Sequence, residues 1–465
     1  MFANSRQIID PICGVLLAVL TVSVIIEDWG LADWVSGLLP WLTGASVLLI
    51  AIHVRYTRKL FVVVALVLTS ILASQSAGWL ATVQKGLATS AFIAAFYIAL
   101  STLRSAAETS RAIREGGLFL ALQPPGWRYL ALTVGGQLFA LILNYGSIAL
   151  LGSLATSSAA AETDPEIRRH RTRRMLLAIQ RAFVSTLSWS PLAFSIAITT
   201  SLVPGTEWSG VVLPGLVTST ILAGTGWALD AIFKPRLNRP PAAAQDAGSW
   251  KSLLPLFLLF ALLATLIGSL RPFTHVRIID LILTVVPFVS IGWLAVQSLV
   301  DDGAPRLGER LKNYVIRELP GFRGELTLLM MAGYIGTVGA PLVSQMLAGA
   351  GLDFTLIPVW LLLASFVWLI PLAGQMGMNP ILAITLALPV LPPPEVLGVS
   401  PTALVVAVVA GWALTGATSP FTATTLLIGS FARISAWRVG WAWNGFYSLV
   451  CAILLSAWVV IYASL

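Results

Sequence analysis

The sequence predicts an all-α polytopic membrane protein with about eleven transmembrane helices, two opposed re-entrant hairpins and two broken helices. Of its 465 residues, 57% are hydrophobic and only 10% are charged, whereas a soluble domain carries about 25% charged residues. The net charge of +8 resides in short loops between apolar segments, which the positive-inside rule explains better than nucleic-acid binding does. Cys13 and Cys451 lie far apart in apolar segments, so we expect neither a disulfide framework nor a zinc site.

Charges in the first loops predict the orientation of the chain. The loop after the first span contains Glu27, Asp28 and Asp33 without Lys or Arg, whereas His53–Lys59 is strongly basic. Because basic loops stay in the cytoplasm, we expect a cytoplasmic N-terminus. An amphipathic helix over Arg104–Gly117 should lie at the inner membrane surface. The spans expected in this part are Pro11–Ile26, Trp34–Ala51, Leu60–Val83 and Leu87–Leu103.

The uncharged segment Tyr129–Ala161 predicts the first hairpin. As one helix it would extend roughly 50 Å at ~1.5 Å per residue, against a hydrocarbon core of about 30 Å. Arg128 before it and the basic cluster Arg168–Arg174 after it both belong in the cytoplasm. A re-entrant hairpin with its tip at Asn144–Ser147 satisfies both, whereas a single long tilted helix would place the cluster outside. Binding of anionic lipid headgroups by the cluster is compatible with this topology.

Two spans are interrupted by hydroxyl side chains followed by a proline. Met175–Leu202 is broken at Ser188–Pro191, and Thr402–Phe431 is broken at Ala417–Pro420. Proline removes a backbone donor and cannot continue a straight helix. A broken helix is tolerated in hydrocarbon only where protein or a polar cavity satisfies the freed groups. A pair of interrupted segments is the best sequence indication of a transporter's binding site.

A second uncharged segment precedes the second break. Phe354–Pro394 is interrupted at Gly374–Pro380 and forms either a hairpin or two complete spans, both of which return to the same face. An interfacial helix is expected near Leu307–Leu319, in a cytoplasmic loop of mixed charge. The remaining spans expected are Val211–Phe233, Leu253–Leu270, Ile278–Leu299, Leu326–Ala350 and Trp441–Ala463, the last of which places the C-terminus outside.

These segments predict five parts in the chain. Scaffold helices, with the interfacial helix, occupy residues 1–127, and further scaffold helices occupy 252–353. The first hairpin, the first broken helix and the following span form a transport half over 128–233. A polar cytoplasmic linker at 234–251 separates the halves. The second hairpin, the second broken helix and the last span form the other transport half, 354–465.

The two hairpin and broken-helix pairs predict an internal repeat. Asn144 and Asn379 match at the hairpin tips, and the two Ser-Pro breaks follow in the same order. An odd number of spans separates the hairpins, so the first enters from the cytoplasm and the second from outside. This is an inverted repeat, which is common among secondary transporters. A competing register matches Pro125–Arg128 with Pro320–Arg323 and would give a parallel repeat.

The layout resembles the ion transporter superfamily and is closest to its divalent anion/sodium symporter family of dicarboxylate and citrate carriers. That family has two opposed hairpins with Ser-Asn-Thr tips and two helices broken at Thr-Pro-Pro-Asn. In this chain the corresponding positions are the tips Asn144–Ser147 and Met378–Pro380, the exit Ala387–Leu391, and the breaks Trp189–Pro191 and Ala417–Pro420. The resemblance implies an elevator motion in a homodimer. The arsenite-efflux and sodium/proton antiport branches of the superfamily are open alternatives.

The ends of the half-helices supply the chemistry of the expected site. Their N-termini favour an anion, and their C-terminal carbonyls, with Ser, Thr and Asn side chains, can coordinate Na⁺. Neither hairpin and neither break contains a charged residue or a histidine. Na⁺ coupling is therefore favoured over proton coupling through Asp230 or Asp280, and the lack of a basic residue argues against chelation of a dicarboxylate by arginine. The expected binding residues are Asn144, Gly146, Ser147, Ser188, Ser190, Asn379, Thr415, Thr418, Ser419 and Thr422, with Na⁺ held by Asn144, Ser188, Asn379 and Thr418.

For each hydroxyl residue in this set there is a purely structural alternative. A Ser or Thr in an apolar helix often only bonds the carbonyl four residues before it, and small residues often serve helix packing.

These features predict a secondary active transporter of a small organic or inorganic anion in the bacterial cytoplasmic membrane. We expect cation coupling, elevator-type alternating access, contact with membrane lipid and a homodimer, with no cofactor apart from Na⁺ and no nucleic-acid partner. A passive anion channel is the alternative outside the superfamily. An enzyme is not expected, because His53, His170 and His275 are scattered along the chain and form no cluster with a nucleophile or metal ligand.

Overall fold

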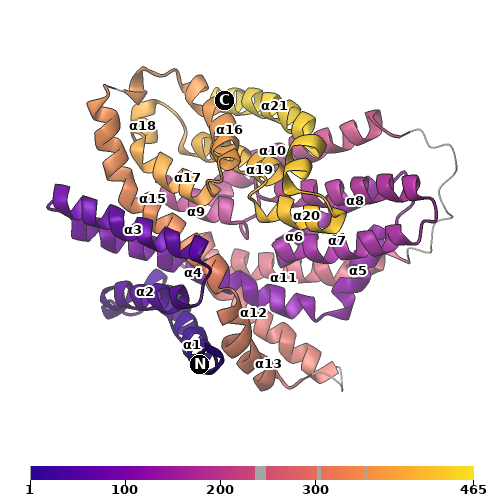
Figure 1. Ribbon diagram of the computed structural model, residues 1–465, viewed down its shortest axis with the longest axis horizontal. Coiled ribbons are helices and arrows are strands. Elements are labelled where there is room, and N and C mark those ends of the chain that lie inside the picture. The colour runs from indigo at the N-terminus through magenta and orange to yellow at the C-terminus, as the bar shows by residue number, and fades with distance from the viewer. Residues whose placement is uncertain (1, 236–247, 301–304, 352) are drawn as a thin grey trace. The chain divides into compact units, whose positions relative to one another are not determined.

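The computed structural model of the chain describes residues 2–235, 248–300, 305–351 and 353–465 (Figure 1). These residues form helices and no strand, so the predicted all-α fold is confirmed. Over this part of the chain, 10 helices are long and apolar enough to cross a bilayer. The predicted span Met175–Leu202 is not among them, because its first half belongs to α8 (Pro165–Thr186), which also carries the basic cluster.

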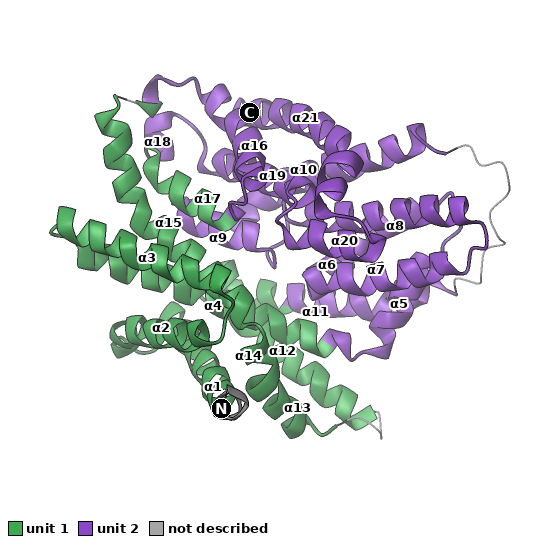
Figure 2. Cartoon of the chain, in the orientation of Figure 1, with its two compact units in different colours: residues 1–106, 266–354, 381–392 green, residues 107–265, 355–380, 393–465 purple. Residues whose placement is uncertain are grey.

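The chain divides into two compact units, coloured green and purple in Figure 2. Unit 1 comprises residues 1–106, 266–354 and 381–392, and unit 2 comprises residues 107–265, 355–380 and 393–465. The chain therefore passes from unit 2 into unit 1 within the predicted second hairpin and returns shortly afterwards. The predicted partition into scaffold and transport halves stays a prediction. Most of the predicted linker 234–251 lies outside the described residues.

Unit 1 is built mainly from the N-terminal helices and from α12 to α15. Its helices are α1 (Phe2–Asp28), α2 (Trp34–Ile52), α3 (Tyr56–Gln75), α4 (Trp79–Glu108), α12 (Ile278–Val300), α13 (Leu307–Asn313), α14 (Leu319–Gly321), α15 (Arg323–Gly349) and α17 (Pro380–Ala387). α3 packs along α15, and α1 packs against α2. α17 lies against α15, where Thr385 donates a hydrogen bond to the carbonyl oxygen of Ala332 at 3.2 Å. A Cβ on Gly336 would lie 1.9 Å from the Thr385 hydroxyl, so this contact requires a glycine.

The expected boundary between the third and fourth spans is wrong. The apolar composition continues to Val83, but α3 ends at Gln75 and α4 begins at Trp79. The turn between them, Ser76–Gly78, consists of small residues that favour turns. So short a turn hardly changes the mean hydropathy of a window as long as a membrane span, so hydropathy does not detect it.

Unit 2 is centred on α19. Its helices are α5 (Arg111–Ala121), α6 (Arg128–Leu143), α7 (Tyr145–Ala160), α8, α9 (Phe194–Leu202), α10 (Trp208–Ile232), α11 (Leu254–Leu270, which ends in unit 1), α16 (Val359–Gln375), α18 (Pro394–Leu397), α19 (Pro401–Thr418), α20 (Ala423–Ala432) and α21 (Gly445–Ala463). In the span formed by α19 and α20, 89% of the residues in the most apolar window are buried. α19 packs against α16, α21, α10, α9 and α8, so it forms the core of this unit.

The first predicted hairpin is present as two helices in contact, α6 and α7, so the alternative of one long helix is wrong. A single residue, Asn144, joins them with φ 49° and ψ −128°. This combination lies outside the left-handed helical region in which asparagine is enriched, so it is strained for residues other than glycine. Both helices pack along α8 (Figure 1). Entry of the hairpin from the cytoplasm stays a prediction.

Replacing Gly411 tests the close packing of α19 on α16. A Cβ on Gly411 would lie 2.3 Å from the carbonyl oxygen of Phe366, which is main chain and cannot turn aside. We expect Gly411→Ala to destabilise the protein by about 1–3 kcal/mol, measured as a lower unfolding temperature in detergent. Gly224→Ala in α10 is the control, because no heavy atom lies within 4 Å of a Cβ there. An equal effect of the two substitutions would contradict the contact.

Candidate substrate and cation site

The two predicted helix breaks are both present in unit 2. α8 ends at Thr186 and α9 begins at Phe194, which confirms the break expected at Ser188–Pro191. α19 ends at Thr418 and α20 begins at Ala423, which confirms the break expected at Ala417–Pro420. Each unwound turn contains a Ser-Pro pair.

The serine of each Ser-Pro pair makes the same local bond. The hydroxyl of Ser190 accepts a hydrogen bond from the amide of Leu192 at 3.1 Å, and the hydroxyl of Ser419 accepts one from the amide of Phe421 at 3.3 Å. This ST-type turn lets the serine side chain hold the backbone where helical bonding stops.

A second bond closes each break from the other side. The hydroxyl of Ser195, in the first turn of α9, donates to the carbonyl oxygen of Leu187, and the hydroxyl of Thr424, in the first turn of α20, donates to that of Gly416. Both bonds span eight residues, and corresponding residues in the two breaks have the same spacing along the chain. The two breaks thus repeat one another in hydrogen bonding as well as in sequence.

At the first hairpin and break, the expected site residues are already bonded within the fold. Ser147 donates its hydroxyl to the carbonyl oxygen of Asn144 at 2.7 Å. Ser188 donates to the carbonyl oxygens of Ser185, at 2.9 Å, and Gly215, at 3.0 Å. Gly146, Ser147, Ser188 and Ser190 are buried. The structure therefore places these residues in the interior of unit 2 without a direct hydrogen bond from the tip to the break.

Gln137 connects the hairpin to the break instead, and the sequence analysis missed it. Its amide oxygen, on α6, accepts hydrogen bonds from the indole of Trp189 in the break, at 3.0 Å, and from the hydroxyl of Ser219 on α10, at 3.1 Å. A polar amide inside an uncharged hairpin is the signal that could have identified it.

At the second break, two expected site residues bond the carbonyl four residues before them, as the purely structural alternative predicts. Thr415 donates to the carbonyl oxygen of Gly411 at 2.9 Å, and Thr418 donates to that of Leu414 at 2.8 Å. Both are bonds to the residue four positions before. A donated hydroxyl still has lone pairs, so a role in cation binding stays a prediction for both.

Ser419 and Thr422 lie in a denser group of oxygens. Ser419 donates its hydroxyl to the carbonyl oxygen of Gly374, the next-to-last residue of α16, at 2.7 Å. The hydroxyl of Thr422 lies 2.9 Å from that of Thr424 and 3.1 Å from that of Thr425. The second break is therefore joined directly to the first arm of the second hairpin.

The two hairpin-tip asparagines occupy similar positions with different backbones. Asn144 directly precedes α7, and Asn379 directly precedes α17. The positive φ of the first tip belongs to Asn144 itself, whereas in the second tip it belongs to Gly377, at φ 87°. The functional pairing of the two asparagines stays a prediction.

Gln375, at the end of α16, supplies an oxygen that the sequence analysis did not consider. Its side-chain carbonyl oxygen is buried and has no hydrogen-bond partner among the described residues. It follows Gly374, which bonds to Ser419 in the second break. A buried acceptor without a donor is costly, and a cation would satisfy it.

Arg181 is a buried charged residue that the residue patterns did not single out. It lies on α8, seven positions before Ser188, and its side chain is only 4% exposed. Its guanidinium donates to the hydroxyl of Tyr129 at 2.8 Å and to the carbonyl oxygen of Gly226 at 3.3 Å. The ring of Tyr447 lies 4.2 Å from it. Among the described residues, no carboxylate lies within ion-pair distance of Arg181.

A chain of amides links Arg181 to the second break. Arg181 donates to the side-chain oxygen of Asn444 at 3.3 Å, and Asn444 donates to that of Gln180 at 3.0 Å. Gln180 in turn lies 3.4 Å from the carbonyl oxygens of both Gly416 and Ala417. The expectation that no basic residue serves this site stays a prediction, and Arg181 reaches the second break only through Asn444 and Gln180. Arg181 is the single charge in the predicted span Met175–Leu202, and a lone charge in an apolar span is a recognised functional signal.

The two carboxylates considered for proton coupling are both ion-paired. Asp230 accepts two hydrogen bonds from Arg174, at 2.8 and 2.5 Å. Asp280 accepts two from Arg277, at 2.7 and 3.0 Å. Both carboxylates are therefore engaged by an arginine in the fold.

Comparison with solved structures finds a similar fold in two membrane transporters. The chain matches the YdaH transporter of Alcanivorax borkumensis at 19% identity, over 88% of this chain and 98% of that chain, with a TM-score of 0.59. It also matches MtrF of Neisseria gonorrhoeae, which illuminates a class of antimetabolite efflux pumps, at 12% identity over 89% and 96% of the two chains, with a TM-score of 0.53. At these identities the likeness shows the fold alone. No model of a known protein family and no curated protein matches the chain, and the resemblance to the divalent anion/sodium symporters stays an expectation.

Removing the Thr424 hydroxyl tests how the second break is held closed. Thr424→Val keeps the shape of the side chain and leaves the carbonyl oxygen of Gly416 with only the long contact to Gln180. An unmade buried bond costs about 1–3 kcal/mol, so we expect amide hydrogen exchange over residues 419–425 to accelerate about tenfold or more. Thr220→Val is the control, because Thr220 is exposed and bonds only Leu216 in its own helix. Unchanged exchange in Thr424→Val would show that this bond does not hold the turn.

Proposed function

We propose that the protein is a secondary active transporter of a small anion, coupled to Na⁺, that works by elevator-type alternating access as a homodimer. The proposal rests on the burial of Arg181 in the helix that breaks at Ser188–Pro191. Among the described residues, this buried cation has no carboxylate partner.

The charge of Arg181 supports an anionic substrate. Burying an uncompensated charge costs several kcal/mol by order of magnitude, and its neutral partners, Tyr129, Gly226 and Asn444, compensate it only in part. Charged residues inside membrane spans mark substrate and ion pathways. The N-termini of α9 and α20, which the breaks create, add two further positive ends. An anion bound at the breaks would supply the missing negative charge.

The oxygens of the second break support Na⁺ as the coupling ion. Ser419, Thr422 and the buried side-chain oxygen of Gln375 are neutral ligands of the kind that broken-helix transporters use. Asp230 and Asp280, the two carboxylates considered for proton coupling, are each held by an arginine away from the breaks. Of the predicted Na⁺ ligands, Ser188 and Thr418 donate their hydrogens elsewhere and would contribute lone pairs only.

Three alternatives to this proposal predict different transport kinetics, ion dependence or direction of transport. A passive anion channel gives flux that does not saturate and does not respond to a Na⁺ gradient. A cation antiporter gives Na⁺- or proton-dependent exchange without any anion. Export is the direction suggested by MtrF, a member of a class of efflux pumps. Net accumulation under an imposed Na⁺ gradient, in proteoliposomes of known orientation, separates uptake from export.

Substituting Arg181 tests the anion site. We expect a screen of carboxylates, phosphate and sulfate to find an anion that raises the unfolding temperature of the wild type by mass action. Arg181→Met removes the charge and should abolish that rise, and Arg181→Lys should weaken it. Both variants should also lose about 1–3 kcal/mol of stability, because the partner groups lose their donor. The same anion-dependent shift in all three proteins would reduce Arg181 to a structural role.

Substituting Asn144 separates its amide from its backbone. Glycine adopts positive φ without strain, so Asn144→Gly keeps the turn and removes the amide. We expect this variant to fold and to lose Na⁺-dependent uptake about tenfold or more, and Asn379→Ala to do the same. Asn144→Ala should lose uptake and also about 1–2 kcal/mol of stability, because alanine is strained at this φ. Normal uptake by Asn144→Gly would remove the amide from the site.

A further inference from the structure

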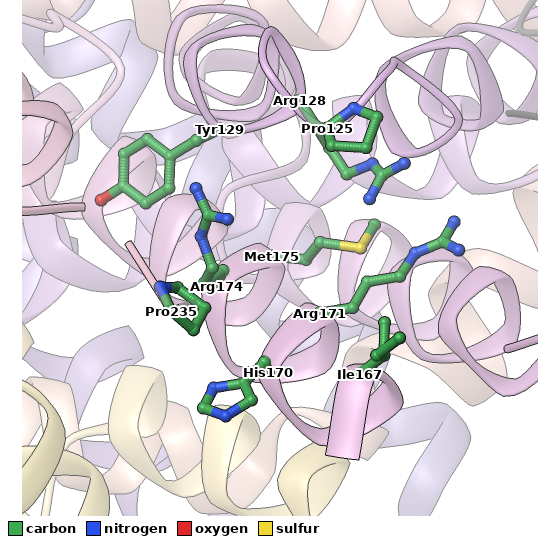
Figure 3. Close-up of a pocket in the computed structure, with 9 residues that line it drawn as sticks. All are labelled: Pro125, Arg128, Tyr129, Ile167, His170, Arg171, Arg174, Met175 and Pro235. Atoms are coloured by element: carbon green, nitrogen blue, oxygen red, sulfur yellow. The ribbon is translucent and has the colours of Figure 1, made fainter. Parts of the chain in front are cut away.

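A second positively charged feature of unit 2 lies at the other end of α8. A cavity of about 70 Å³ lies between the start of α6 and the first turns of α8. Arg128, Tyr129, His170, Arg171, Arg174 and Met175 are among its lining residues (Figure 3). In Figure 3 the side chains of Arg128 and Arg171 extend toward one another, whereas that of Arg174 extends toward Tyr129.

The charges around this cavity are only partly balanced. Arg174 is neutralised by its two bonds to Asp230, and His170 lies 3.9 Å from Glu166. Arg128 donates to the carbonyl oxygen of Gln123 at 2.7 Å. Within the described residues, no carboxylate approaches Arg128 or Arg171 to ion-pair distance.

Arg171 has an unused donor. One terminal nitrogen of its guanidinium donates to the hydroxyl of Ser158 at 2.6 Å. Its Nε is buried and has no hydrogen-bond partner among the described residues. Burial lowers the pKa of Arg171, and the charge of Glu162 acts in the opposite direction. A buried charged donor without an acceptor is costly, and an oxyanion in the cavity would remove that cost.

The dimensions and the donors select the ligand. A water molecule needs about 10–15 Å³ of such volume, so the cavity has room for several waters, which is the scale of a phosphate group and not of a larger metabolite. Guanidinium groups bind phosphate oxygens through paired N–H donors. Basic pockets between membrane helices on the cytoplasmic side bind lipid headgroups, and the predicted topology places Arg168–Arg174 on that side.

We propose that the cavity binds a phosphate group between Arg128 and Arg171, either of an anionic lipid headgroup or of free inorganic phosphate. Bound there, the phosphate joins the first turn of α6 to the basic turns of α8. The proposal depends on these two helices and not on transport, so it can fail or succeed independently of the proposed function.

The test uses the full-length protein in delipidated detergent micelles. Dihexanoyl-phosphatidylglycerol, dihexanoyl-phosphatidylcholine and inorganic phosphate are titrated at constant ionic strength, and the unfolding temperature gives an apparent affinity for each. We expect phosphatidylglycerol to stabilise the wild type more than phosphatidylcholine does. Arg171→Gln and Arg128→Gln should each weaken that affinity about tenfold or more. A matching response to inorganic phosphate identifies the free ion as a ligand, and its absence identifies the lipid headgroup.

Three further variants protect the test from misfolding and from general charge effects. Arg171→Lys and Arg128→Lys keep the charge and lose the paired donors, so they should fold and bind with intermediate affinity. Arg169→Gln removes an exposed arginine of the same helix that does not line the cavity, and should bind as the wild type does. Equal losses in Arg169→Gln and Arg171→Gln, or no preference of the wild type for phosphatidylglycerol or phosphate, would overturn the proposal.

Discussion

Every peptide group inside a membrane needs a hydrogen-bond partner from the protein, and the two unwound turns are where this chain meets that constraint. The prolines at positions 191 and 420 remove a donor from each turn. In both turns a hydroxyl of the following helix bonds the carbonyl eight residues back, and the serine before the proline holds the next free amide. Side chains thus close both turns, so each helix can stay broken within the fold.

Arg181 is connected to one of these interruptions through Asn444 and Gln180. The C-terminal end of a helix carries a partial negative charge that favours a cation. Arg181 lies near the end of α8, and its neighbour Gln180 contacts the last carbonyls of α19. Both helix ends exist only because the helices break. The ring of Tyr447 adds a cation–π contact of the strength expected for a desolvated arginine.

The sequence predicts those features of this molecule that depend on interactions between neighbouring residues, and not those that depend on contacts between distant helices. The breaks at Ser188–Pro191 and Ala417–Pro420 and the reversal near Asn144 are predictable, because proline, hydroxyl and asparagine side chains act on their immediate neighbours. The role of Arg181 is not, since Tyr129 and Asn444 reach it from helices far along the chain. The sequence shows that Arg181 is the single charge in an apolar span. Its lack of a carboxylate partner among the described residues depends on how the helices pack. The same holds for Gln375, whose unpaired oxygen depends on what surrounds it.

The two breaks share one hydrogen-bonding pattern, but the helices that lead into them differ in charge. This difference matters for how a transporter of this design would work. The helix that ends at the first break, α8, carries the buried positive charge of Arg181 seven residues before Ser188. The second adjoins Gln375, Ser419 and Thr422 and presents oxygens, and neither α16 nor the span from Pro401 to Ala432 contains a charged residue. Donors with positive charge suit an anion, and neutral oxygens suit Na⁺. In the proposed mechanism each half therefore binds one of the two ions. When both ions are bound, their opposite charges partly cancel. The loaded protein would then carry less net charge across the hydrocarbon than with either ion alone, which lowers the free energy of moving the site through the membrane.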